Sequence, residues 1–310
     1  MAPLLLLFLA ADLFDLSGSL SPAASASVSI HRVLSPFVAH AMTGSDGRFT
    51  FRKIEPGAYI VSVFIPSRGE ARQTVEVGPG TADSRRRVAV KLELKDSDFA
   101  FEDLIKRRHA INSKQLAIPE RAVRDYQEAQ KLLTKHDVEA AVRRLERAVN
   151  IAPQFSGAWN NLGTIAYQRQ KYPQAAECFR KALAQDPELY EPLVNLGGVL
   201  LKLRRPREAY DYNVRAVVER PNDALANSQF GLTYLELGSM DMAEKYLRKA
   251  SELDPAHFSH PQLVLAGIHL RQGHPVAAAA DLADFLKHHP DWEQAPAIRE
   301  KIAEWKKGSL

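Results

Sequence analysis

The sequence predicts a multidomain α+β chain, in which a small N-terminal β-sandwich is followed by an all-α solenoid of helical hairpins. Three observations support this. Apolar residues alternate with period two as far as about residue 94 and recur with a helical period of 3.6 beyond residue 120. Pro153, Pro187, Pro221 and Pro255 are 34 residues apart, and Pro290 follows after 35. Small residues recur in phase with these prolines, which indicates stacked copies of one unit.

The small residues indicate where the two helices of each unit touch. Bulky side chains at a helix crossing of roughly 8–10 Å would overpack, so these positions are expected at the contact. Three columns repeat every 34 residues: Ala129, Gly163, Gly197 and Gly231 in the first helix, and Ala141, Ala175, Ala209 and Ala243 with Ala148, Ala182, Ala216 and Ala250 in the second.

The second unit carries a family resemblance. Trp159, Leu162, Gly163, Ala175, Phe179, Ala182 and Pro187 stand at the offsets of the tetratricopeptide repeat (TPR) consensus. The chain therefore resembles a TPR protein, which implies a superhelix of stacked hairpins. We expect five repeats at 119–153, 154–187, 188–221, 222–255 and 256–290, followed by a capping helix within 291–310. The other repeats diverge, with Asp125, Leu193 and Asn227 in place of Trp159 and with Asn213 in place of Phe179.

The resemblance also implies a binding surface. In this family the first helices line a concave groove that holds extended peptides or partner helices. Four carboxamides recur at one position of these helices: Gln127, Asn161, Asn195 and Gln229. Because a carboxamide both donates and accepts, such a column can pair with peptide groups. The alternative is that these amides hold neighbouring repeats together. Further candidates for the same groove are Tyr126, Asn160, Tyr167 and Lys202.

The N-terminal part reads as short strands separated by turns. Strands are predicted at 48–51, 59–64, 73–77 and 88–94, with a poorly marked first strand at 28–33. The run from Thr43 through Asp46-Gly47 and Pro56-Gly57 to Val63 resembles the core of the carboxypeptidase regulatory-like, transthyretin-like module. Phe49, Phe51, Tyr59, Val61 and Val63 are expected to fill its core.

The segment before the predicted sandwich bears on the cellular location of the protein. Residues 1–26 form a candidate signal peptide or disordered leader, with an apolar run at 4–9 and an A-x-A-like site at Ala24-Ser25-Ala26. Against export, no Lys or Arg precedes the run. The sandwich is then expected at 27–95 and a linker at 96–118. We expect a periplasmic or secreted protein, with a cytoplasmic location as the alternative.

Catalytic and metal motifs are not found in the sequence. It contains no phosphate-binding loop, nucleophile elbow or paired-cysteine metal spacing, so we expect no enzyme activity, no metal and no cofactor. His136 and Glu139 have a metal-ligand spacing but fall at a turn between helices. His257, His260, His288 and His289 lie at repeat junctions and are expected to be capping or solvated residues. The net charge of +4 without a basic stripe argues against nucleic acid as a partner.

Two functions remain open. The first is a non-enzymatic scaffold that binds a peptide or protein in the concave groove at the bacterial cell envelope. The second is a carbohydrate- or polymer-binding module that uses the sandwich, with the repeats as an adaptor. Sugar platforms need exposed Trp or Tyr, and the sandwich has no Trp, so we favour the first function.

Overall fold

The computed structural model describes residues 12–33, 38–66, 68–95, 99 and 117–307. The N-terminal part forms seven strands in two sheets. The strands are β1 (Phe14–Ser21), β2 (Ser27–Arg32), β3 (Val38–Met42), β4 (Arg48–Ile54), β5 (Gly57–Ile65), β6 (Gly69–Val77) and β7 (Arg87–Glu93). One sheet has the order β4-β1-β7 and the other the order β3-β2-β5-β6. The predicted β-sandwich is therefore present.

The core of the sandwich follows the alternation of the sequence. Phe49, Phe51, Tyr59, Val61 and Val63 all point inward and are at most 5% exposed. The prediction for these five residues is confirmed. In β6 the intervening residues face the other way, so the strand presents polar side chains on the outer face of its sheet.

The start of the sandwich differs from the prediction. The segment assigned to a leader, 1–26, contains β1, which lies between β4 and β7 and pairs with both. Phe14, Leu16 and Leu20 are buried, and Gly18 leaves room for the ring of Phe49, which would lie 2.1 Å from an added Cβ atom. The sandwich thus begins at Phe14 rather than at residue 27. The apolar run at 4–9 and most of the predicted linker, 96–118, fall outside the described residues.

The C-terminal part is a TPR solenoid. Each predicted repeat contains one pair of helices, and a final helix follows. The helices are α3 (Glu120–Thr134), α4 (Val138–Ile151), α5 (Ser156–Gln168), α6 (Tyr172–Gln185), α7 (Tyr190–Lys202), α8 (Pro206–Glu219), α9 (Ala224–Glu236), α10 (Met240–Leu253), α11 (Pro261–Arg271), α12 (Pro275–His288) and α13 (Ala295–Lys307). In the described part of the chain no helix combines the length and apolar character that crossing a bilayer requires.

The small-residue columns lie at the helix contacts, as expected. All eight alanines of the two second-helix columns are fully buried. A Cβ atom on Gly163 would lie 2.6 Å from the ring of Phe179, and one on Gly231 would lie 2.7 Å from Leu247. Each of these glycines faces a large side chain of its own second helix, so the crossing distance depends on the absence of a side chain there.

In repeats two, four and five, the residue at the position of Trp159 donates an equivalent hydrogen bond to the carbonyl of the proline that precedes its helix. Trp159 Nε1 donates to the carbonyl of Pro153 over 2.9 Å, Asn227 Nδ2 to that of Pro221 over 2.9 Å, and Gln262 Nε2 to that of Pro255 over 2.7 Å. These side chains therefore satisfy the same junction carbonyl with different donors. At Pro187, where Leu193 cannot donate, Arg215 reaches the carbonyl over 3.3 Å.

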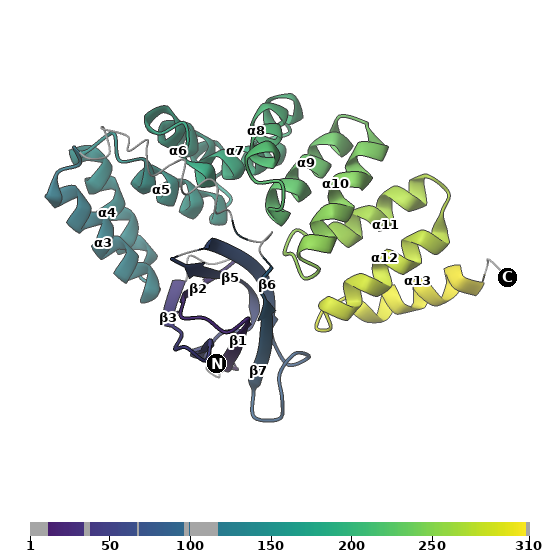
Figure 1. Ribbon diagram of the computed structural model, residues 1–310. Helices are drawn as coiled ribbons and strands as arrows, with labels where there is room; N and C mark the ends of the chain where they lie inside the picture. The colour runs from purple at the N-terminus through teal and green to yellow at the C-terminus, as the bar shows by residue number, and fades with distance from the viewer. Residues whose placement is uncertain (1–11, 34–37, 67, 96–98, 100–116, 308–310) are drawn as a thin grey trace, which may run out of the picture.

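The two parts of the chain are packed together. The helix pairs form an arc, and the sandwich lies on its inner side, with the sheet of β2, β5 and β6 turned toward the helices (Figure 1). The last helix, α13, places Ile298 and Ile302 against the cluster around Phe285, as a capping helix should.

The alanine columns predict a stability effect. Replacing Ala182, which is fully buried in α6, by Leu should lower the free energy of unfolding by about 1–3 kcal/mol through overpacking. Ala184→Leu, at an exposed site of the same helix, is the control and should leave the transition nearly unchanged. Chemical denaturation of both variants measures the difference. Equal midpoints would show that the assigned repeat register is wrong.

Candidate functional site

The repeat register sets the C-terminal ends of the second helices in a row. The C-cap residues of the second helices in repeats two to five, one before each of the last four recurring prolines, are Asp186, Arg220, Asp254 and His289. We call these four residues the junction row. Because each repeat adds the same rise and rotation, they follow one another along one edge of the solenoid.

Strand β6 runs along the C-terminal half of this junction row. The backbone N–H of Thr74 donates to Asp254 Oδ2 over 3.0 Å in a buried contact. Glu76 Oε1 lies 3.1 Å from His289 Nδ1, one repeat further on. In the other direction Arg72 pairs with Glu191 over 3.3 Å, and Glu191 lies 4.0 Å from Arg220. The outward side of one strand thus contacts three successive repeats.

The loop after β6 continues the contact to the end of the solenoid. Both carboxylate oxygens of Asp291 accept from the backbone N–H of Gly80 over 2.8 Å. A Cβ atom would lie 2.5 Å from this carboxylate at Gly80 and 2.6 Å from it at Gly78. The close approach therefore requires glycine at both ends of Gly78-Pro79-Gly80.

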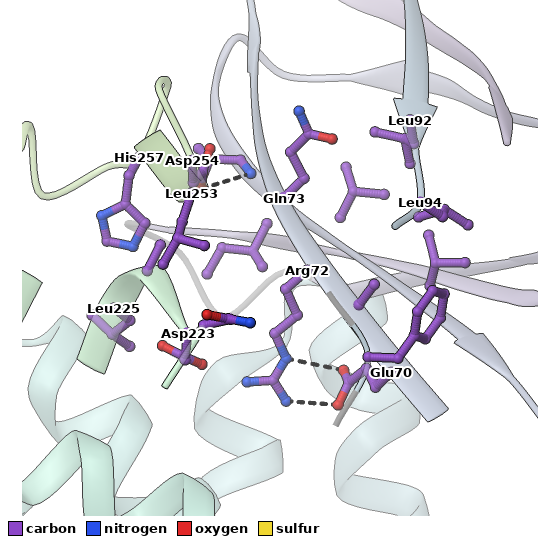
Figure 2. A pocket seen from close by; sticks show the side chains of 18 of the residues that line it. Glu70, Arg72, Gln73, Leu92, Leu94, Asp223, Leu225, Leu253, Asp254 and His257 are labelled. Atoms are coloured by element: carbon purple, nitrogen blue, oxygen red, sulfur yellow. Dashed lines mark hydrogen bonds and ion pairs between the residues drawn. The ribbon is translucent and has the colours of Figure 1, made fainter. Parts of the chain in front are cut away.

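A cavity of about 760 Å³ lies between the sandwich and the junctions of repeats three to five. Figure 2 shows its lining, with β6 crossing it and the ends of the helices opposite. The sandwich contributes Glu70, Arg72, Gln73, Leu92, Leu94 and Phe99, and the solenoid contributes Arg220, Asp223, Leu225, Leu253, Asp254 and Phe258 among other described residues. Its size is that of a typical ligand-binding cleft.

The charges in this cavity are paired with one another. Arg72 donates from Nε and Nη2 to the two oxygens of Glu70, over 3.0 and 2.9 Å (Figure 2). Burial alone would raise the pKa of Glu70, but the charge and hydrogen bonds of Arg72 lower it overall. The guanidinium of Arg220 stacks 3.8 Å from the ring centre of the buried Tyr190. The cavity therefore presents no concentration of one sign of charge.

Two titratable groups at the cavity edge are strongly perturbed. Asp254 is 5% exposed, and burial raises its pKa to about 6 against the opposing hydrogen bonds from Thr74. His257 is 3% exposed, and burial lowers its pKa to about 3. His257 is thus a buried residue, which corrects the prediction that it is capping or solvated, whereas His260 and His289 do stand at helix caps. The cap residue His289 is itself enclosed by Glu76 of the sandwich, His260 and Phe285.

The predicted groove residues lie on the first helices of the repeats. α5 packs on α7 and α7 on α9 more closely than any two second helices pack, so the first helices lie on the inside of the curve. Tyr126, Asn160, Asn161, Asn195 and Gln229 are partly buried there. Gln127, Tyr167 and Lys202 are exposed. Glu191, at the junction end of α7, pairs with Arg72 of β6, whereas Tyr167 and Lys202 lie at the opposite ends of α5 and α7.

The amide column makes contacts between neighbouring repeats. Asn161 hydrogen-bonds with Tyr126 of the preceding repeat, a bond that opposes the rise that burial causes in the pKa of Tyr126. Asn195 Nδ2 lies 3.5 Å from Asn160 Oδ1, which is at the long limit of a hydrogen bond. The carboxamide of Gln229 packs against Gly198, where an added Cβ atom would lie 2.5 Å from its Nε2. These contacts agree with the alternative of inter-repeat bonding.

The β6 contact was not predicted from the sequence. The junction row does stand one residue before the proline column, so its spacing was visible in the sequence. Nothing in that spacing identifies β6 as its partner. Among the described residues, no group of three or more His, Cys, Asp or Glu side chains is placed to hold a metal ion. His136 stands at the turn between α3 and α4, and Glu139 pairs with Arg169 over 2.6 Å.

Comparison with known proteins identifies the class of repeat. Tetratricopeptide repeat family models match residues 156–189 and 224–257. The solved structure of MamA from Desulfovibrio magneticus RS-1 superimposes with a TM-score of 0.51 at 21% identity, covering 57% of this chain and 99% of that chain. The helical part is therefore a TPR solenoid, a scaffold of the kind that mediates contacts between proteins.

Sequence relatives match only part of the chain. The chain is 25% identical over 122 residues to the BBSome complex member BBS4 homolog of Drosophila melanogaster, covering 39% of this chain and 25% of that protein. It is 30% identical over 125 residues to the type IV pilus assembly protein PilF of Pseudomonas aeruginosa, covering 39% of this chain and 49% of PilF. The chain thus spans about half the length of PilF and a quarter of the BBS4 homolog.

The buried bond between Thr74 and Asp254 predicts a local effect. Asp254→Ala leaves the Thr74 N–H buried without an acceptor, which should weaken the docking of β6 by about 1–3 kcal/mol. Hydrogen exchange of residues 69–77 should accelerate accordingly. Asp186→Ala, at the equivalent junction of the second repeat, is the matched control, since Asp186 bonds locally to the backbone of Glu188. Unchanged exchange in Asp254→Ala would contradict this view of the interface.

The buried histidines predict a loss of stability in acid. Burial lowers the pKa of His31 to about 4, of His257 to about 3 and of His260 to about 4, so these side chains stay neutral in the folded state while the unfolded chain protonates near pH 6.5. Their contribution is fully present above pH 6.5 and is lost as the pH falls toward 4. Asp254, with its pKa raised to about 6, opposes this trend because its protonation favours the folded state.

Since three histidines outweigh one aspartate, the free energy of unfolding should fall between pH 6.5 and 4.5. His257→Gln should reduce that slope by up to about 1.4 kcal/mol per pH unit, the value for one titrating group. Urea denaturation at several pH values measures both slopes. Parallel curves for the wild type and the variant would contradict the assignment of His257.

Proposed function

We propose that this protein is a non-enzymatic interaction scaffold that binds an extended peptide or a partner protein along the first helices of its first three repeats. The observation that carries the proposal is the asymmetry of the inner surface. Gln127, Tyr167 and Lys202 are exposed there, whereas β6 covers the junction ends in repeats three to five. The free part of the inner surface is therefore the part around Gln127, Tyr167 and Lys202, because β3 contacts α3 and β6 reaches Glu191 at the start of α7.

The amide column gives this surface a chemistry for peptide groups. The 3.5 Å contact between Asn195 and Asn160 is weak enough to be exchanged for bonds to a ligand. Asn161 is already partly satisfied by Tyr126, and the carboxamide of Gln229 is packed against Gly198, so the proposed ladder centres on Asn160, Asn161 and Asn195. Tyr126, Gln127, Tyr167 and Lys202 flank it.

We further propose that the scaffold works at the bacterial cell envelope. Support comes from the partial similarity to PilF, a type IV pilus assembly protein, and from the resemblance of the sandwich to the carboxypeptidase regulatory-like module. The sugar-binding alternative finds less support, because Tyr59, the residue of the predicted core best suited to a sugar platform, is 1% exposed.

The groove predicts a loss of binding on removal of the amides. The full-length variant Asn161→Ala/Asn195→Ala should recover its partner from a lysate of the source cells with an affinity about 5–150-fold lower, the effect of two hydrogen bonds. Gln174→Ala/Gln294→Ala, which removes two exposed amides outside the first helices, is the control. If both double variants recover the partner equally, the amides do not bind it.

Export can be tested at the N-terminus. Cleavage after Ala26 would remove β1, the middle strand of its sheet, and would therefore unfold the sandwich. If the protein is exported, its mature N-terminus should lie before Phe14. Sequencing the N-terminus of the protein from its source cells decides this. An N-terminus at or after Ser27 would contradict the assignment of β1.

A further inference from the structure

Strand β6 has one free edge. It pairs with β5 on one side only and ends the sheet β3-β2-β5-β6. The N–H of Thr74 bonds to Asp254 and the carbonyl of Glu76 accepts from Thr81 Oγ1, so the backbone groups of these even-numbered residues point away from β5. Because backbone direction alternates along an antiparallel strand, those of Glu70 and Arg72 point the same way.

The solenoid and the following loop therefore protect only one end of this edge. Asp254 accepts from the N–H of Thr74, and Thr81 Oγ1 donates to the carbonyl of Glu76. In the described part of the chain, no residue is hydrogen-bonded to the outward N–H and carbonyl groups of Glu70 and Arg72. An unpaired strand edge is a template for a further strand.

The unpaired segment lies in the cavity of about 760 Å³ rather than in open solvent. Figure 2 shows the cavity beside Glu70, Arg72 and Gln73. Apolar side chains border it on both sides: Leu92, Leu94 and Phe99 from the sandwich, and Leu225, Leu253 and Phe258 from the solenoid. A ligand paired to this edge would therefore place its alternate side chains against apolar surface.

The electrostatics favour a ligand that is recognised through its backbone. Glu70 and Arg72 neutralise each other, and Glu191 lies between Arg72 and Arg220. A phosphate-rich or strongly charged ligand would meet no excess of opposite charge. What the cavity offers is a row of backbone donors and acceptors flanked by apolar side chains, which matches an extended, uncharged peptide.

We propose that this cavity is a second binding site, in which an extended peptide segment of a partner protein adds as a strand to β6 at Glu70–Arg72. The site is distinct from the inner surface of the first three repeats. Both domains build it, because the sandwich supplies the strand edge and the junctions of repeats three to five supply the opposite wall.

The test uses the full-length chain and a phage-displayed library of random heptapeptides. Peptides that are enriched on the wild type are synthesised and titrated against Arg72→Pro and Arg72→Ala. Both variants lose the guanidinium and its ion pairs, but only Pro also removes the outward N–H. This N–H makes no bond to β5, and proline is tolerated on edge strands, so the sheet should persist. Each enriched peptide is also made with N-methyl groups on alternate residues, in both registers.

We expect a class of enriched peptides that binds Arg72→Pro at least tenfold more weakly than Arg72→Ala. One of the two N-methylated registers should lose binding by the same factor, because it removes the donors that face β6. If Arg72→Pro does not fold, the two N-methylated registers decide the matter on the wild type. Equal binding by both registers overturns the proposal, as does the absence of any enriched peptide.

The groove variant separates this proposal from the proposed function. Peptides of the strand-adding class should bind Asn161→Ala/Asn195→Ala as they bind the wild type. If every enriched peptide loses affinity for that double variant and binds Arg72→Pro and Arg72→Ala alike, the groove is the binding site and strand addition to β6 is wrong. If every enriched peptide keeps its affinity for that double variant and binds Arg72→Pro more weakly than Arg72→Ala, strand addition to β6 is supported and peptide binding by the amides is wrong.

Discussion

The contact between β6 and the junction row is the interaction on which the arrangement of the two domains depends. A fixed repeat length brings Arg220, Asp254 and His289 into line, although they are separated by 34 and 35 residues in the chain. A β-strand also presents its residues at regular intervals, through alternation. The spacing of the repeats thus matches the two-residue spacing along β6. As a result, Arg72, Thr74 and Glu76 each contact a polar group in a successive repeat.

This contact is polar and partly buried, so its strength depends on how well each group is satisfied. Asp254 illustrates the balance, because its burial alone would favour the protonated acid, while the Thr74 N–H stabilises the carboxylate. At the far end, two glycines allow the backbone to reach Asp291 directly. Such contacts specify one docking geometry more than they add to stability, since charged partners must give up water to meet.

The parts of the fold that rest on periodic patterns were predictable from the sequence. The alanine columns required close helix crossings, and the alternation around Phe49 and Tyr59 required a sandwich core. β1 was missed although Phe14, Leu16 and Leu20 alternate. The adjoining apolar run resembled a signal peptide, and Gly18 interrupts the inward-facing series. The inward glycine has a packing reason, the ring of Phe49, which only the three-dimensional structure reveals.

The interface was beyond sequence reasoning for a physical cause. Its central bond joins Thr74 and Asp254, which lie 180 residues apart, and it uses a backbone N–H that carries no residue-specific signal. The amide column presents the opposite difficulty. Its 34-residue spacing was clear from the sequence, but that spacing fitted both peptide binding and bonding between neighbouring repeats. The contacts of Asn161 with Tyr126 and of Asn195 with Asn160 show that an amide can join repeats while remaining partly accessible at their inner surface.

Docking of the sandwich and binding in the cavity are thermodynamically linked. A ligand that contacts both β6 and the junction loops binds the docked arrangement better than an undocked one, and it must therefore stabilise docking by the same free energy. The proposed groove is built by first helices of the solenoid, so a ligand there contacts β6 only indirectly, through the shape of the solenoid. Any partner that changed the curvature of the solenoid would move Glu191, Asp254 and Asp291 relative to one another, and one rigid strand with its loop could no longer match all three. Through that geometric constraint, occupation of one surface would alter affinity at the other.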